Sequence, residues 1–73
     1  MKVGEKRLTA LFMGEARKIN VNGKEMRCEN GEGYSILFYD GKRLKLSTED
    51  FDWNSPRVMR TVCDKVNGFF GIE

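Results

Sequence analysis

The 73-residue sequence contains no histidine, a single proline and two cysteines. Histidine is the commonest general base and metal ligand in proteins, and it is the usual partner of a nucleophilic cysteine. Cys28 and Cys63 lie 35 residues apart in the sequence and do not make a zinc site by themselves. We therefore expect a protein that is not an enzyme and that holds no metal and no cofactor.

Long apolar segments are also lacking, since no run approaches the ~20 residues that span a bilayer. The charged segment Met1–Arg7 leads into only six weakly apolar residues, which are too few for a signal peptide. These absences favour a cytoplasmic protein without a membrane partner. In that compartment we expect each cysteine to be a small buried apolar residue rather than half of a disulfide.

The composition is typical of a folded globular chain, with 40% hydrophobic and 33% charged residues. We expect residues 1–73 to form a single domain and a monomer. Charge is spread unevenly, because residues 1–28 carry seven Lys/Arg against three Glu, whereas residues 29–55 carry three against six acids. This split favours a charged macromolecular partner over a small ligand.

The strongest structural signals are two hairpin turns, Asn22-Gly23 and Asp40-Gly41, each flanked by apolar residues that alternate with other residues. Type I′ turns need positive φ at both central residues, which these dipeptides adopt at little steric cost. The first hairpin is expected over residues 16–28. Its predicted core side holds Ile19, Val21, Met26 and Cys28.

The second hairpin is expected over residues 34–46, with Phe38 opposite Arg43 and Leu37 opposite Leu44. Leu37, Leu44 and Leu46 then face the core. The opposite side of this hairpin is not a clean polar surface, because it carries Tyr34, Ile36, Phe38, Arg43 and Lys45.

Three segments give weaker signals. Residues 8–13 fit helical spacing through Leu8, Leu11 and Phe12, and they also fit a strand; we expect a strand that ends or bulges at Gly14, because sheet follows. Residues 29–33 are expected to be a flexible connection. Residues 47–54 read as a short helical turn or an ordered loop.

A helix is predicted from about Pro56 to Asn67, with Ser55 as N-cap and Gly68 as the residue that ends it. The fold class is therefore α+β: a small antiparallel β-meander of four or five strands, with two tight hairpins and one C-terminal α-helix packed on it. The predicted core comprises Leu11 or Phe12, Ile19, Val21, Met26, Leu37, Leu44, Leu46, Val58, Val62 and Val66.

Phe38, Arg43 and Lys45 form the first candidate partner-binding site. Aromatic rings beside cations are typical of single-strand nucleic-acid platforms, and an apolar ring with a charged rim is typical of protein interfaces. Two other interpretations stay open: the Lys and Arg stems cover the apolar side chains, or a second core layer buries this face.

Two further sites are expected from the sequence. Phe51 and Trp53 lie among acids and resemble a protein-binding anchor, although Trp53 can equally fill a gap between sheet and helix. Lys6 and Arg7, together with Lys2, belong to a basic N-terminal arm, and we expect residues 1–6 of it to be flexible. Such an arm can dock on an acidic protein surface or on phosphates.

In its size, its hairpin-and-helix layout and its basic Lys2, Lys6 and Arg7, the chain resembles small bacteriophage proteins that bind and redirect host machinery, among them RNA polymerase-binding antiterminators. The resemblance implies a non-catalytic regulator or inhibitor, located in the host cytoplasm, that occupies a surface of a larger protein such as RNA polymerase in transcription regulation. The alternative is a small nucleic-acid-binding domain that uses the aromatic and basic sheet face.

Overall fold

The Asn-Gly and Asp-Gly turns are formed as expected in the computed structural model, which describes all residues 1–73. Asn22 and Gly23 have φ of 53° and 85°, and Asp40 and Gly41 have φ of 51° and 75°. These turns join β1 (Lys18–Val21) to β2 (Lys24–Gly31) and β3 (Tyr34–Tyr39) to β4 (Lys42–Ser47). The predicted registers are confirmed, including Ile19 opposite Met26 and Phe38 opposite Arg43.

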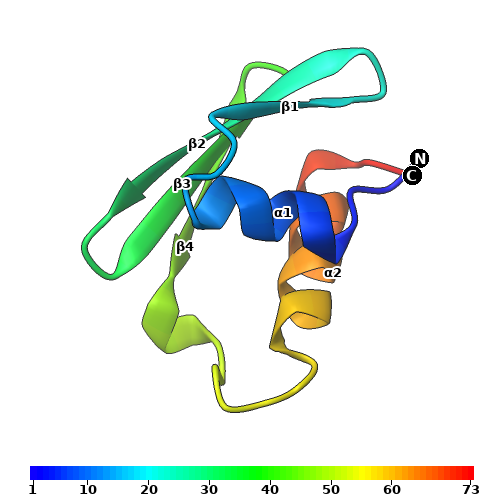
Figure 1. Cartoon of the computed structure of the whole chain (residues 1–73). Coiled ribbons are helices and arrows are strands. Elements are labelled where there is room, and N and C mark those ends of the chain that lie inside the picture. Colours follow the sequence, from blue (N-terminus) through cyan, green and yellow to red (C-terminus); the bar gives the residue numbers. More distant parts are fainter.

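The four strands form one antiparallel sheet in the order β1-β2-β3-β4 (Figure 1). Helix α1 (Glu5–Phe12) and helix α2 (Val58–Phe70) pack against the same face of this sheet. The class is α+β, as predicted, but with two α-helices instead of one. A 3-10 turn, η1 (Thr48–Asp50), lies within the segment expected to be a helical turn or ordered loop.

The expectation of a strand over residues 8–13 is wrong, because these residues lie in or directly after α1. Leu8 and Leu11 are 0% and 1% exposed, which shows that helical spacing directs both toward the core. Gly14, with φ of 76°, ends the helix in a Schellman motif. The Glu15 N–H donates to the Ala10 carbonyl at 2.9 Å, and the Gly14 N–H donates to the Leu11 carbonyl at 3.3 Å.

The predicted bounds of the C-terminal helix are also wrong, by two residues at its start and three at its end. The chain turns at Ser55, whose hydroxyl accepts from the Arg57 N–H at 3.2 Å, and α2 begins at Val58. The helix continues through Gly68 to Phe70, whose ring is 7% exposed and lies one turn beyond Val66 on the buried side. Gly71, with φ of 67°, then ends it.

The expected flexible connection at residues 29–33 is a third hairpin turn. Strand β2 continues through Gly31, and Glu32-Gly33 leads directly into β3, with Gly31 opposite Tyr34. Gly33 supplies the positive φ, at 78°. Because of this turn, β2 and β3 pair along six positions and join the two predicted hairpins into one sheet.

One cluster of buried apolar side chains fills the space between sheet and helices. Most of the predicted core is confirmed, whereas Ile19 and Val58 are only half-buried. Of the two cysteines expected to be buried, Cys63 is buried and Cys28 is half-buried. The core members that were not predicted are Val3, Leu8, Tyr39, Phe70 and Ile72.

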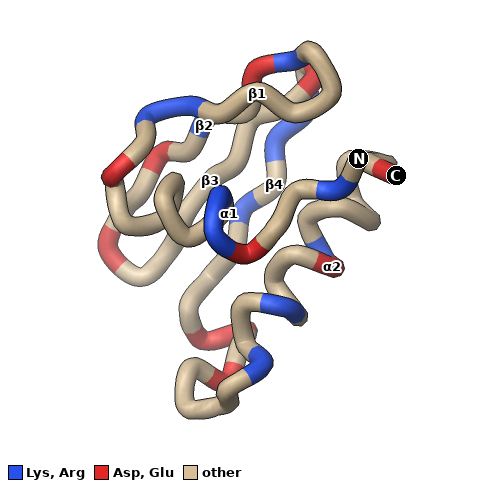
Figure 2. Tube along the Cα trace, turned by 45° about the vertical axis from the view of Figure 1, so that its right-hand side comes forward, with Lys and Arg blue, Asp and Glu red and all other residues tan.

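The two ends of the chain lie side by side (Figures 1 and 2). The buried amide of Asn67 donates to the Val3 carbonyl at 3.1 Å and accepts from the Val3 N–H at 3.0 Å. Val3 itself is 2% exposed, and residues 5 and 6 already belong to α1. Within the segment expected to be a flexible arm, Val3 is thus held by Asn67 and residues 5 and 6 begin α1, while the other residues are exposed.

Candidate functional site

The sheet face opposite the helices carries no covering element and forms the candidate site. Strand β3 supplies the apolar strip of this face. Leu37 and Tyr39 point into the core, so the alternate residues Tyr34, Ile36 and Phe38 point the other way. We call this surface the open face. It comprises Lys18, Glu25, Arg27, Glu29, Tyr34, Ile36, Phe38, Arg43 and Lys45.

Phe38 lies between two arginines, since it pairs with Arg27 of β2 and with Arg43 of β4. The Arg27 guanidinium carbon is 5.8 Å from the centre of the Phe38 ring, within cation–π range. Along the same strand, the Lys45 ammonium lies 4.9 Å from the centre of the Tyr34 ring. Cationic side chains therefore cover both rings in part, as one of the sequence interpretations proposed.

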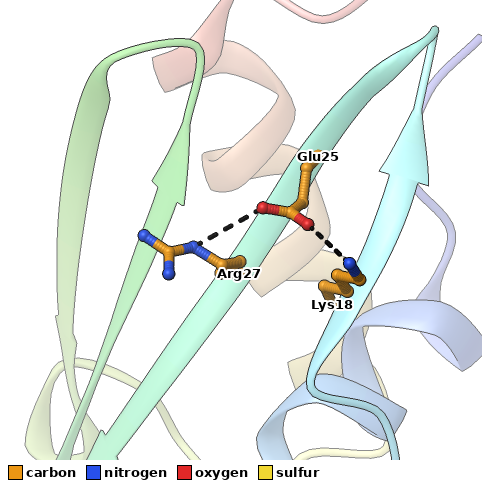
Figure 3. Close-up of polar contacts among 3 residues, drawn as sticks. All are labelled: Lys18, Glu25 and Arg27. Atoms are coloured by element: carbon orange, nitrogen blue, oxygen red, sulfur yellow. Dashed lines mark ion pairs between the residues drawn. The ribbon is translucent and has the colours of Figure 1, made fainter.

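Glu25 links Lys18 of β1 and Arg27 of β2, two cations on the open face (Figure 3). Its carboxylate is 3.1 Å from the Lys18 ammonium and 3.7 Å from Arg27 Nε. All three side chains are about half exposed or more, so each pair contributes little to stability. The carboxylate of Glu25 is therefore already paired with Lys18 and Arg27. The positive charges of Lys42 and Arg43 have no ion-pair partner within the chain.

A hollow of about 420 Å³ lies beside Phe38 at the β3–β4 turn. Only two of its eight lining residues are hydrophobic, whereas small-molecule sites are lined mainly by apolar side chains. Such a hollow suits a side chain at the surface of a macromolecule better than a buried ligand. Its lining residues are Glu25, Arg27, Phe38, Tyr39, Asp40, Gly41, Lys42 and Arg43.

Phe51 and Trp53 form a separate surface below the sheet. Their rings meet edge to face at 6.0 Å, and Trp53 is 48% exposed while its indole N–H donates to the Thr48 carbonyl at 2.6 Å. A smaller pocket of about 180 Å³ between β4 and α2 includes both rings together with Phe12, Leu46 and Val62. Acidic residues gather in the segment between β4 and α2, opposite basic residues at the start of α2 (Figure 2).

Lys6 and Arg7 lie in α1, on the helix side of the sheet and away from the open face. The Arg7 guanidinium donates to the Asn20 carbonyl of β1, so this cation serves a structural contact within the chain. The structure thus places the predicted site residues in three regions: the open face, the Phe51/Trp53 surface and α1.

Among the residues of the open face that the predicted site left out, Arg27 and Tyr34 take part in its ring–cation contacts. The sequence placed Tyr34 on this side without selecting it, and it placed Arg27 on the polar face of a different hairpin. The missing signal was the Glu32-Gly33 turn, since a two-residue turn there sets Arg27 opposite Phe38.

Neither cysteine has the environment of a nucleophile. Burial, and then the nearby charges of Glu5 and Asp64, raise the pKa of the Cys63 thiol to about 11. Burial also raises the pKa of the Cys28 thiol, whose Sγ lies 3.2 Å from the Asn30 side-chain oxygen. Both thiols are free in the structure.

Comparison of the chain with protein-family models, with curated proteins and with solved structures gives no match. Neither helix has the length and apolar character needed to cross a membrane.

Proposed function

We propose that this chain is a non-catalytic binding module that recognises a larger protein through the open face and regulates or inhibits it. The observation that carries the proposal is the asymmetry of the sheet. Both helices cover one face, while the other presents the strip Tyr34, Ile36 and Phe38, with Arg27, Arg43 and Lys45 on the neighbouring strands.

Phe38 is the anchor in this proposal. Its ring is half-buried and lies between Arg27 and Arg43, so a partner surface that covers it also desolvates two guanidinium groups. Aromatic and arginine side chains dominate the binding energy of protein interfaces, and a charged rim adds specificity.

The identity of the partner rests on resemblance. A small histidine-free chain with a hairpin sheet is similar to bacteriophage proteins that redirect host machinery, and RNA polymerase is the partner which that resemblance implies. We propose that the module acts by occupying a surface of such a machine in the cytoplasm, as a monomer and without chemistry of its own.

A single-stranded nucleic acid is the second candidate, because Tyr34 and Phe38 lie on a sheet beside Arg27, Arg43 and Lys45. Bases stack on such rings, and cations hold phosphates. Against this reading, Lys45 and Arg27 already lie over the two rings. Glu25 and Glu29 also lie on the same face, where they repel phosphates.

Site-specific photo-crosslinking tests the proposal. A photoreactive amino acid in place of Ile36 on the open face is compared with the same amino acid in place of Asp64, which is exposed on α2. We expect a discrete protein adduct in extracts of the source cells from the Ile36 position only. An adduct from both positions, or from neither, contradicts the proposal.

Binding to labelled single-stranded RNA and DNA, measured between 50 and 200 mM salt, separates the two candidates. The protein-partner function predicts no binding at the upper salt concentration. Micromolar affinity that falls steeply with salt supports the nucleic-acid alternative instead.

A further inference from the structure

The outer edge of β4 carries backbone groups that pair with no other strand. In a two-residue hairpin the residues that flank the turn exchange both backbone hydrogen bonds, and successive pairs then alternate. Tyr39 and Lys42 flank the Asp40-Gly41 turn, so Leu44 and Leu46 bond to β3 in the same way. The N–H and C=O groups of Arg43 and Lys45 therefore point outward.

The opposite edge of the sheet shows how the chain satisfies such groups. By the same alternation the Asn20 carbonyl points outward from β1, and the Arg7 side chain donates to it. No hydrogen bond from another segment reaches Arg43 or Lys45 of β4. On the β1 edge, α1 thus satisfies one outward carbonyl, whereas on the β4 edge the outward donors and acceptors of Arg43 and Lys45 have no partner.

The charges of β4 select the kind of strand that can add there. Lys42, Arg43 and Lys45 are exposed, no acid lies on the strand, and none of the three forms an ion pair. A second copy of β4 would bring the same three positive charges and be repelled, which is how edge lysines prevent self-association. An acidic strand meets no such repulsion.

On the other side of β4, Leu44 and Leu46 are 8% and 5% exposed, so the helix-facing side of an added strand borders the edge of the apolar core. Leu46 lines the 180 Å³ pocket with Phe51 and Trp53, next to the end of the strand. Side chains of an added strand alternate between the two faces of the sheet. Those on the open face would meet Arg43 and Lys45, and those on the helix side would lie beside Leu44 and Leu46.

The geometry points to the β4 edge as a docking site for an extended protein segment in which acidic and apolar residues alternate. The segment adds as a fifth strand, its backbone bonding to Arg43 and Lys45 and its carboxylates pairing with their side chains. This inference rests on the proposed function, since it specifies how the partner protein is bound, and it makes the partner acidic at the contact.

Amide hydrogen exchange of the full chain tests the free edge directly. We expect the Arg43 and Lys45 amides to exchange at least tenfold faster than those of Leu44 and Leu46, and to become protected when the peptide acetyl-Glu-Val-Glu-Val-Glu-Val-Glu-amide is added. Slow exchange of Arg43 and Lys45 in the free protein, or unchanged exchange with saturating peptide, overturns the inference. A peptide with lysine in place of every glutamate serves as the charge control and is expected to give no protection.

Two variants of Lys45 separate the backbone contact from a merely electrostatic one: Lys45→Ala removes the charge and keeps the N–H, whereas Lys45→Pro removes both. Lys45→Pro removes an outward N–H without removing a bond to β3, because proline is tolerated where the donor faces solvent. Lys18→Pro makes the matched change on the β1 edge. We expect at least tenfold weaker peptide binding for Lys45→Pro than for Lys45→Ala, and less than twofold change for Lys18→Pro, with the fold of all three variants checked by circular dichroism. Equal loss for Lys45→Pro and Lys45→Ala would show that the contact is electrostatic only.

Equal weakening by the two proline variants would overturn strand addition. The proposed function fails separately, through the crosslinking result at Ile36. If the Ile36 adduct forms and the amides of Arg43 and Lys45 stay unprotected in the complex, the open face binds the partner and the β4 edge does not.

Discussion

Asn67 holds Val3 through both backbone groups of that residue, although the two are 64 positions apart in the sequence. The same side chain donates to the Cys63 carbonyl at 2.9 Å. Asn67 is only 5% exposed, and both its amide nitrogen and its amide oxygen are hydrogen-bonded within the chain. One side chain on α2 thereby fixes the start of the chain and the entry into α1.

Asn67→Ala should lower the free energy of unfolding by about 2 to 4 kcal/mol, because it leaves both polar groups of Val3 buried without a partner. Urea denaturation measures this change. Asp64→Ala, on the exposed side of the same helix, is the control and should stay within about 0.5 kcal/mol of the parent. Equal losses for the two variants would show that the Asn67–Val3 contact does not stabilise the fold.

Leu8→Ala tests the assignment of residues 5–12 to a helix. Leu8 is fully buried on the core side of α1, so its truncation to alanine should lower the free energy of unfolding by about 2 to 5 kcal/mol. Met13, which is 70% exposed after the helix, should tolerate alanine with a change below about 0.5 kcal/mol. A strand over this segment predicts a different pattern, in which Leu8 and Ala10 are equally sensitive to a charged substitution.

The sequence predicted the two hairpins and their registers because Asn-Gly and Asp-Gly turns determine pairing locally. It did not predict α1, because the segment fits helical spacing through Leu8, Leu11 and Phe12 and also fits strand alternation through Leu8, Ala10 and Phe12. What decides between them is tertiary: Leu8 and Leu11 fit the space between the sheet and α2 only at helical spacing.

For the site, the sequence placed Phe38, Arg43 and Lys45 on one face correctly, since a single hairpin sets their relation. It did not bring in Arg27, because that residue belongs to a neighbouring hairpin and only the Glu32-Gly33 turn joins the two. The sequence indicated Phe51 and Trp53, and Lys6 and Arg7, as further sites but did not place them relative to this face. The position of a segment in space depends on packing between distant elements.

Tyr34 lies over Gly31, its cross-strand partner, and this contact explains why a glycine ends β2. A methyl group added at Gly31 would overlap the Tyr34 ring, so Gly31→Ala should force the ring away and reduce stability by about 1 to 2 kcal/mol. In the Tyr34→Ala background the same substitution should be neutral or stabilising, because alanine loses less backbone entropy than glycine on folding. A penalty that persists in that background would locate the strain in the backbone rather than in the ring.

The raised pKa of Cys63 predicts how stability changes at alkaline pH. The thiol keeps its proton in the folded protein up to a pKa of about 11, whereas it ionises from about 9.0 in the unfolded chain. The unfolded state therefore binds fewer protons in this window, and stability falls as pH rises from about 9 to 11. Urea denaturation across that range should show a shallower decline for Cys63→Ala than for the parent, and identical slopes would contradict the assignment.

The central claim is that Phe38 anchors a protein partner on the open face. Its most direct test is the dissociation rate of the parent and of Phe38→Ala from the partner identified by crosslinking, measured by surface plasmon resonance, alongside the urea stability of both proteins. We expect Phe38→Ala to dissociate about 10-fold faster or more, as removal of an interface anchor worth at least ~1.4 kcal/mol implies, with little change in association rate. Unchanged affinity together with a loss of about 3 kcal/mol or more in stability would show instead that Phe38 is a core residue.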